Sequence, residues 1–211
     1  MAGGTIARHV ADGDTVQVFT FTDGVSARAA GREPGDVERR ERELMTAVDV
    51  LGAGVLATHV FPDNRMDSVP LLEVAQAVEK ALVRYRPDII YTHHAGDLNV
   101  DHRIVAQAVA TATRPGSEIR KGVRAVYAGE TPSSTEWAFG ATGPPFTPQR
   151  FVALSSKHLG QKQQALACYA SEGRPPGHPR YAGSVSALAQ WRGAQCGHEW
   201  AEAFMVVREV W

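Results

Sequence analysis

The chain has 211 residues, of which 22 are Lys or Arg and 23 are Asp or Glu, so its formal net charge is −1. Without an excess of positive charge or an extended basic stretch, the sequence does not suggest a nucleic-acid-binding protein. At 44% hydrophobic residues the chain can bury a stable core, and we interpret residues 1–211 as a single domain.

The cysteine content and the apolar segments bear on where the protein works. Only Cys168 and Cys196 are present, too far apart for a CxxC motif and too few for a disulfide framework. No apolar run reaches the roughly 18 residues needed to span a bilayer. The first residues, "MAGGTIARHVADGD", lack the apolar region of a secretory signal. We therefore predict a cytoplasmic protein without a membrane span.

Strand-like and helix-like segments alternate along most of the chain. Runs rich in β-branched and aromatic residues predict strands at 15–22, 55–60, 88–93, 123–129, 150–154 and 201–207. Apolar residues at helical spacing predict helices at 37–51, 69–85, 101–114, 156–170 and 184–194. Between them, 130–150 carries four prolines and is predicted to be a long surface loop. This alternation is typical of an α/β fold with a parallel sheet.

The stretch "THHAGDLNVDHR" (92–103) packs three histidines and two aspartates into twelve positions, directly after a predicted strand. Ligands of open α/β sheets bind at the carboxyl ends of strands, so this is where an active site is expected. A simpler interpretation is also open. Asp101 would then cap the next helix, Asp97 and Asn99 would form turns, and the histidines would be ordinary loop residues.

Histidines and carboxylates together are also what a hydrolytic zinc site requires. Such a site takes three protein ligands and leaves one position for a water molecule, whose pKa the metal lowers. His102 is a candidate ligand, and the adjacent Asp101 could hold or tune a neighbouring histidine.

Several stretches, in order along the chain, give this sequence a family resemblance. They are "GGTIARH" (3–9), "FTDGVSAR" (21–28), "FPDNRMDSVPLL" (61–72), "THHAGDLNVDHRIV" (92–105), "SSTEW" (133–137), "HPR" (178–180) and "AEAF" (201–204). With these the chain resembles the PIG-L/LmbE family of metal-dependent de-N-acetylases, which act on N-acetylglucosaminyl conjugates. The resemblance implies a three-layer α/β/α sandwich with a mostly parallel, Rossmann-like sheet, here without its first strand.

The resemblance also implies roles for residues of the histidine-rich stretch. His102 matches a zinc ligand of the family, and Asp101 matches the acidic residue before it. Many members have a histidine three residues before the ligand that polarises the carbonyl or protonates the leaving amine. Asn99 occupies that position here, so His94 or Asp97 could share the role.

The family's N-terminal "HPDD" motif, which supplies two zinc ligands and the general base, is not in this sequence. Three explanations stay open. The natural protein starts upstream, or the chain is a shortened paralogue, or a metal binds through His93, His94, Asp97 and His102. The first explanation would make residues 1–211 an N-terminally truncated form of the domain.

Further residues are candidates for contact with a substrate. Relatives use an arginine near Arg65, although a surface arginine is an equal alternative. Ser134, Glu136 and Trp137 could line a sugar pocket, with Trp stacking on a sugar face, or belong to a covering loop. His178 could lie at the pocket mouth or be an ordinary loop histidine.

We therefore predict a Zn²⁺-dependent hydrolase that removes an N-acetyl or other N-acyl group from a small amino-sugar conjugate. The alternative is a catalytically inactive paralogue that binds a sugar or a protein partner. No GxSxG elbow supports a serine hydrolase, and no complete GxGxxG supports a dinucleotide-binding protein. Assembly into a homo-oligomer stays open.

Overall fold

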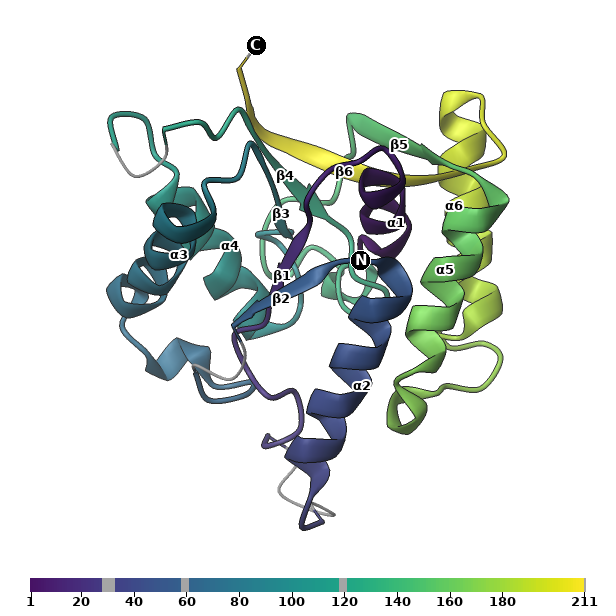
Figure 1. Cartoon of the computed structure of the whole chain (residues 1–211), viewed down its shortest axis with the longest axis horizontal. Coiled ribbons are helices and arrows are strands. Elements are labelled where there is room, and N and C mark those ends of the chain that lie inside the picture. Colours follow the sequence, from purple (N-terminus) through teal and green to yellow (C-terminus); the bar gives the residue numbers. More distant parts are fainter. Residues whose placement is uncertain (28–32, 58–60, 118–120, 211) are drawn as a thin grey trace. The chain divides into compact units, whose positions relative to one another are not determined.

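The computed structural model describes residues 1–27, 33–57, 61–117 and 121–210. Its elements are α1 (Gly3–Ala11), β1 (Gln17–Phe19), α2 (Asp36–Leu51), β2 (Gly54–Ala57), η1 (Met66–Ser68), α3 (Leu71–Tyr85), β3 (Ile89–His93), α4 (Val100–Ala112), β4 (Ala125–Gly129), η3 (Glu136–Ala138), β5 (Arg150–Leu154), α5 (Ser156–Ala167), η4 (Ala170–Glu172), α6 (Ala182–Cys196) and β6 (Trp200–Glu209), labelled in part in Figure 1. The predicted α/β class is confirmed.

Most predicted elements agree with the observed ones to within a few residues. β1 is shorter than the predicted strand at 15–22, and of the strand predicted at 55–60 the last three residues lie outside the described ones. The helix α1 was not predicted. Its first two residues are glycines, which weaken any helical signal in the sequence.

The strands form two sheets. One contains β1 and β2, which are parallel, and the other has the order β3-β4-β6-β5. β3 and β4 are parallel, with His93 opposite Gly129 at their carboxyl ends, whereas β6 is antiparallel to β4. No helix in the described part of the chain is long and apolar enough to cross a membrane.

The chain divides into two compact units, which we describe separately. The first unit contains Asn64–Arg150 and the strand β6 from Ala203 onward. In it α3 and α4 pack against each other (Figure 1). The buried apolar side chains of these two helices are Val74, Ala75, Val78 and Leu82 on α3 and Val105, Ala106, Ala108, Val109 and Ala112 on α4. Removing this much apolar surface from water is the main contribution to the stability of the unit.

An aromatic group completes the core of the first unit. The Tyr91 ring of β3 lies 5.5 Å from that of Tyr127 on β4 and 4.8 Å from that of Phe204 on β6. Tyr127 and Phe204 are almost completely buried. Three neighbouring strands are thereby joined by side chains as well as by backbone hydrogen bonds, which fixes the position at which β3 ends.

The second unit contains Ala2–Asp63 and Phe151–Glu202. Its helices α1, α2 and α5 pack together around a small cluster of buried side chains, Ala7, Ala47, Leu51 and Ala165. Small residues allow the helix backbones to come close. At Gly3 of α1, for example, an added Cβ would lie 3.1 Å from a side-chain carbon of Lys162 on α5.

A buried carboxylate caps the first helix of the second unit. Both oxygens of Glu202 accept hydrogen bonds from α1, one from the Gly4 amide at 3.1 Å and one from the Thr5 amide at 2.7 Å. Lys162 on α5 donates to the same carboxylate at 2.6 Å. Burial opposes ionisation of Glu202, but the Lys162 ammonium and these hydrogen bonds prevail and lower its pKa.

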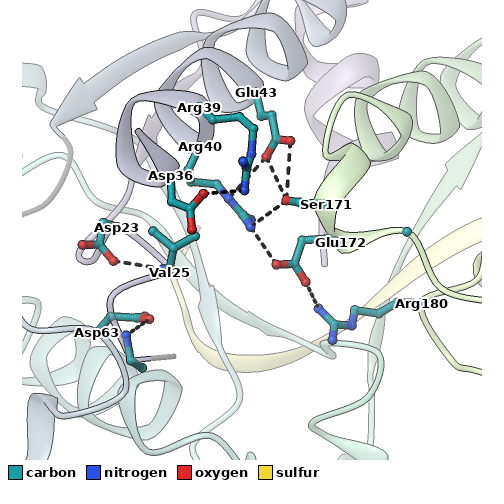
Figure 2. Close-up of polar contacts among 12 residues, drawn as sticks. Asp23, Val25, Asp36, Arg39, Arg40, Glu43, Asp63, Ser171, Glu172 and Arg180 are labelled. Carbon is teal, nitrogen blue, oxygen red and sulfur yellow. Dashed lines mark hydrogen bonds and ion pairs between the residues drawn. The ribbon is translucent and has the colours of Figure 1, made fainter. Parts of the chain in front are cut away.

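A second charged group of this unit is centred on Glu172 (Figure 2). Its carboxylate binds the guanidinium groups of Arg40 at 2.6 Å, Arg180 at 3.1 Å and Arg174 at 3.2 Å. Arg40 belongs to α2, and Glu43 one turn further on contacts both Arg40 and Ser171. These contacts fasten the segment that follows α5 to the side of α2.

Candidate active site

The histidine-rich stretch follows β3 in the first unit and leads into α4. β3 ends at His93, and its parallel neighbour β4 ends opposite it at Gly129. The stretch therefore lies at the carboxyl edge of parallel strands, where a ligand site is expected in an α/β sheet.

The carboxylate of Asp97 is the centre of the hydrogen-bond network in this stretch. Asp97 is completely buried, and it accepts hydrogen bonds from the Thr135 hydroxyl at 2.7 Å, from the Ser134 hydroxyl and from the Asn99 amide at 2.9 Å. The Nδ1 atom of His102 lies 3.0 Å from the same carboxylate. Burial opposes the charge, but the bonds from His102 and the hydroxyls lower the pKa of Asp97 well below its usual value.

This network determines which nitrogen of His102 is available for chemistry. An ionised Asp97 only accepts hydrogen bonds, so the Nδ1 atom of His102 carries a proton, and in the neutral form of the ring the lone pair is on Nε2. The His102 side chain is 20% exposed while that of Asp97 is fully enclosed. Asp97 therefore holds a partly accessible imidazole in one tautomer, the arrangement found behind metal-binding and proton-transferring histidines.

His93, the last residue of β3, lies flat against His102. The two ring centres are 3.9 Å apart and the rings are parallel, with an interplanar angle of 0°. The Nδ1 atom of His93 is buried and has no hydrogen-bond partner in the described part of the chain. Burial and, next, the neighbouring His102 lower the pKa of His93 well below its usual value, so its ring is neutral at physiological pH.

A zinc site of the hydrolytic type would need three protein ligands. Within the described ranges, no three His, Cys, Asp or Glu side chains come together in a way that could hold a metal ion. His93 does not complete a set with His102, because a histidine binds a metal in the plane of its ring and two parallel planes never meet. The described residues thus offer His102 as a single ligand and do not fit a complete zinc site.

Asp101 lies in the first turn of α4 but does not cap it, in contrast to the simpler interpretation of the sequence. The side chain of Asn99 caps α4 by accepting from the Asp101 amide at 2.8 Å. The Asp101 carboxylate instead accepts from the Asn64 amide at 2.6 Å and from the Met66 amide at 3.0 Å. The Asp101 carboxylate thus binds the backbone amides on both sides of Arg65, whose side chain is exposed.

The candidates Asn99 and His94 both have structural contacts. The Asn99 side chain is engaged in the cap of α4. His94 is buried, its Nε2 atom is 3.0 Å from the Pro144 carbonyl oxygen, and its ring meets Phe146 edge to face. His94 therefore fastens the loop that follows η3 against the stretch after β3.

The remaining candidates are distributed between the two units. Ser134 belongs to the site, but its hydroxyl is used by Asp97. Glu136 accepts a hydrogen bond from the Ser133 amide at 2.6 Å, and Trp137 on the same turn is 38% exposed. His178 belongs to the second unit, where it accepts from the Arg180 amide at 3.0 Å.

Reasoning from the sequence gave too little importance to Asp97, His93 and Thr135. Asp97 was considered as a turn residue, as one of four alternative metal ligands and as a substitute for the missing histidine, but not as the partner of His102, and Thr135 was not considered. A signal for Asp97 was available in its spacing, because a carboxylate five residues before a histidine at a helix start can turn back to it. For Thr135, 38 residues away, the sequence contains no such signal.

The family profile of PIG-L, described as GlcNAc-PI de-N-acetylase, matches residues 1–113, which is more than half of the chain. The chain belongs to the PIG-L family. The matched residues include β3, the histidine-rich stretch and α4. Asp97, Asp101 and His102 therefore lie within the part of the chain that matches the PIG-L family. No curated protein matches the sequence.

Solved structures share the fold of this PIG-L protein. The conserved protein TT1542 from Thermus thermophilus is 25% identical, with a TM-score of 0.73 over 100% of this chain and 89% of that one. An N,N'-diacetylchitobiose deacetylase from Pyrococcus horikoshii is 16% identical, with a TM-score of 0.73 over 98% and 78%. GalB, the 4-carboxy-2-hydroxymuconate hydratase of Pseudomonas putida, is 24% identical, with a TM-score of 0.70 over 98% and 89%. The last two likenesses show the fold alone.

Proposed function

We propose that this PIG-L protein is an amide hydrolase that removes an acyl group, such as acetyl, from the nitrogen of an amino-sugar conjugate. Family membership and the deacetylase among the similar structures support this reaction class. The observation that carries the proposal is the pairing of Asp97 with His102, because it fixes a reactive imidazole nitrogen at the carboxyl edge of the sheet.

Each residue of the site has a part in this proposal. In the neutral ring, the bond from Nδ1 to Asp97 leaves the lone pair of His102 on Nε2, so that this atom can bind a cation or take up a proton. Arg65 on its fixed loop would bind an oxygen-rich part of the conjugate, and the exposed face of Trp137 would stack on a sugar ring. The hydroxyl of Ser134 binds Asp97 and the carboxylate of Glu136 binds the Ser133 amide, so in this proposal these two residues would support the sugar pocket through their neighbours.

In this proposal, one residue of the site is a candidate zinc ligand. When bound, a zinc ion supplies an acidified water molecule and polarises the acyl oxygen. His102 would be its ligand in this chain. We also propose that the protein acts in the cytoplasm, where a reducing environment suits two free cysteines.

A second candidate function is favoured by the incomplete ligand set. A PIG-L protein without three zinc ligands could retain the fold as a sugar-binding or partner-binding paralogue that catalyses no reaction. The described residues, among which no such triplet is found, support this alternative. In that case Arg65 and Trp137 would keep their contacts with a sugar, while His102 would have no chemical task.

Metal content and activity together test the two candidates. The purified chain is dialysed exhaustively, its zinc is measured by elemental analysis, and acetate release from an N-acetylglucosaminide is followed. For the hydrolase we expect about one zinc per chain, together with acetate release. Both should be lost in His102→Ala and retained in His198→Ala, which alters an exposed histidine of the second unit. A chain that binds no zinc and releases no acetate supports the paralogue.

A further inference from the structure

The stacked pair of His93 and His102 has a consequence beyond the choice of metal ligands. A histidine side chain can rotate about two bonds, and its ring must stop in one plane before its nitrogen points in a fixed direction. The bond to Asp97 fixes one atom of the His102 ring, Nδ1, but still permits the ring to rock about the line through that atom. Some other contact has to hold the ring plane.

His93 provides that contact. Its ring is parallel to the His102 ring, and with ring centres 3.9 Å apart the two faces are in contact. His93 itself is positioned by the last residue pair of the β3–β4 ladder, opposite Gly129, so its backbone belongs to the rigid sheet.

The Nδ1 atom of His93 does not explain why a histidine ring stands here. Its Nδ1 atom is buried without a partner among the described residues, and its ring plane cannot share an ion with His102. A ring that uses neither a hydrogen bond on its buried side nor a common metal acts through its face.

We infer that His93 is a positioning residue, a flat platform that sets the ring plane of His102, while Asp97 sets its tautomer. The relevance of this platform to catalysis rests on the proposed function, but the stacking itself does not. The platform needs an aromatic face and no imidazole nitrogen, so a phenyl ring should replace it.

The test compares His93→Phe, which keeps a ring, with His93→Leu, which has a similar size and no ring. Ring protons that lie over an aromatic face resonate upfield of their usual position, and NMR of the full chain can follow those of His102. We expect upfield His102 ring resonances in the wild type and in His93→Phe, and a return toward ordinary positions in His93→Leu. His9→Gln, in the second unit, assigns one other histidine and should leave the His102 signals unchanged.

Activity provides an independent comparison. If the hydrolase is active, His93→Leu should lower kcat by about a hundredfold, as expected for a misplaced reacting group, with little change in KM. His93→Phe should restore most of kcat. A phenyl variant that keeps the upfield His102 signals but loses zinc or activity would overturn the proposal, because a nitrogen of His93 would then be required.

The wild-type protein alone can also contradict the inference, whatever the folding of the variants. Magnetisation transfer between the ring protons of His93 and His102 must be observed if the rings are stacked, and its absence would refute the platform. The two proposals can also fail separately. If the chain has no deacetylase activity, the proposed function is refuted. If that chain still shows magnetisation transfer, and His93→Leu loses the upfield His102 signals, the platform is supported.

Discussion

Among single residues, Asp97 connects the largest number of groups in the candidate site. Its carboxylate joins the turn after β3, the first turn of α4 and two hydroxyls of the loop before η3. None of these groups has water as a competing partner at Asp97, because the side chain is completely buried. Loss of the Asp97 charge should therefore lower the stability of the protein and disturb the orientation of the His102 ring.

We expect Asp97→Asn to lower the free energy of unfolding by ~2 kcal/mol, since hydrogen bonds to a buried charged group contribute more than neutral ones. The asparagine side chain also has one NH₂ group where a second acceptor is needed. Urea unfolding at pH 7 measures the change. Asp88→Asn is the matched control, because the Asp88 side chain is 70% exposed and its substitution should leave the unfolding free energy nearly unchanged.

The same residue shows what a sequence can reveal about a site. The candidates His102 and Asp101 could be chosen from a short motif, since chemically apt residues stand together in it. The motif does not reveal what each residue binds. The loop partners of Asp97 are 37 and 38 positions away, and those of Asp101 are 35 and 37 positions away. Such pairings depend on how the chain returns to the sheet, which local spacing does not specify.

At the scale of elements, α1 depends on a residue from the other end of the chain. Ala2, at its N-cap position, has no side-chain oxygen, and the first amides are satisfied by Glu202 instead. A negative charge at this position also interacts favourably with the helix dipole. The strand β6 thus supplies, near its beginning, the cap that the sequence around α1 lacks.

We expect Glu202→Gln to destabilise the protein by ~3 kcal/mol at pH 7, because it leaves the Lys162 ammonium largely buried without its counter-charge. The folded-state pKa of Glu202 is lowered, so its stabilising contribution is complete above the unfolded value of about 4.3. The contribution is lost as the pH falls through the lower folded value. The difference in unfolding free energy between wild type and variant should therefore shrink below about pH 4.3.

Denaturant unfolding between pH 7 and pH 3 provides this comparison. Glu199→Gln serves as the control, because Glu199 is exposed on the same segment and should give no difference at any pH in this range. A gap between Glu202→Gln and the wild type that stays constant as the pH falls would show that the capping charge is not responsible.

Helices α2 to α6 were recognisable from the sequence because each carries apolar residues at helical spacing. α1 was not, since its glycines disfavour a helix and its cap lies 197 or 198 positions away. The 3-10 turns η1, η3 and η4 are too short for any periodic signal. The local sequence pattern therefore predicts helices whose own apolar residues form a buried face. It fails for a helix such as α1, which depends on hydrogen bonds from a residue far away in the chain.

At the scale of the whole molecule, charge is nearly balanced, with a formal net charge of −1 and an isoelectric point of about 6.7. Several large apolar side chains are exposed, including Leu72 and Val83 of α3, Trp191 of α6 and Phe139. Molecules with little net charge repel each other weakly, so exposed apolar groups can bring copies together.

We expect the purified chain to self-associate more strongly near its isoelectric point of about 6.7 than at about pH 8.5, where its net negative charge is larger. Sedimentation velocity over a range of protein concentrations measures the change in average mass. Association that is equal at both pH values, and insensitive to salt, would instead indicate a specific oligomer held by an apolar interface.

The hydrogen bonds from the Asn64 and Met66 amides to the Asp101 carboxylate have a practical consequence for enzyme engineering. Because the carboxylate holds both flanking amides and the Arg65 side chain is exposed, we expect most substitutions at position 65 to leave the loop geometry intact. That position can be randomised as a single-site library while the scaffold stays intact. If Arg65 contacts the substrate as proposed, substrate preference can thus be varied at this point of the chain without a large effect on folding.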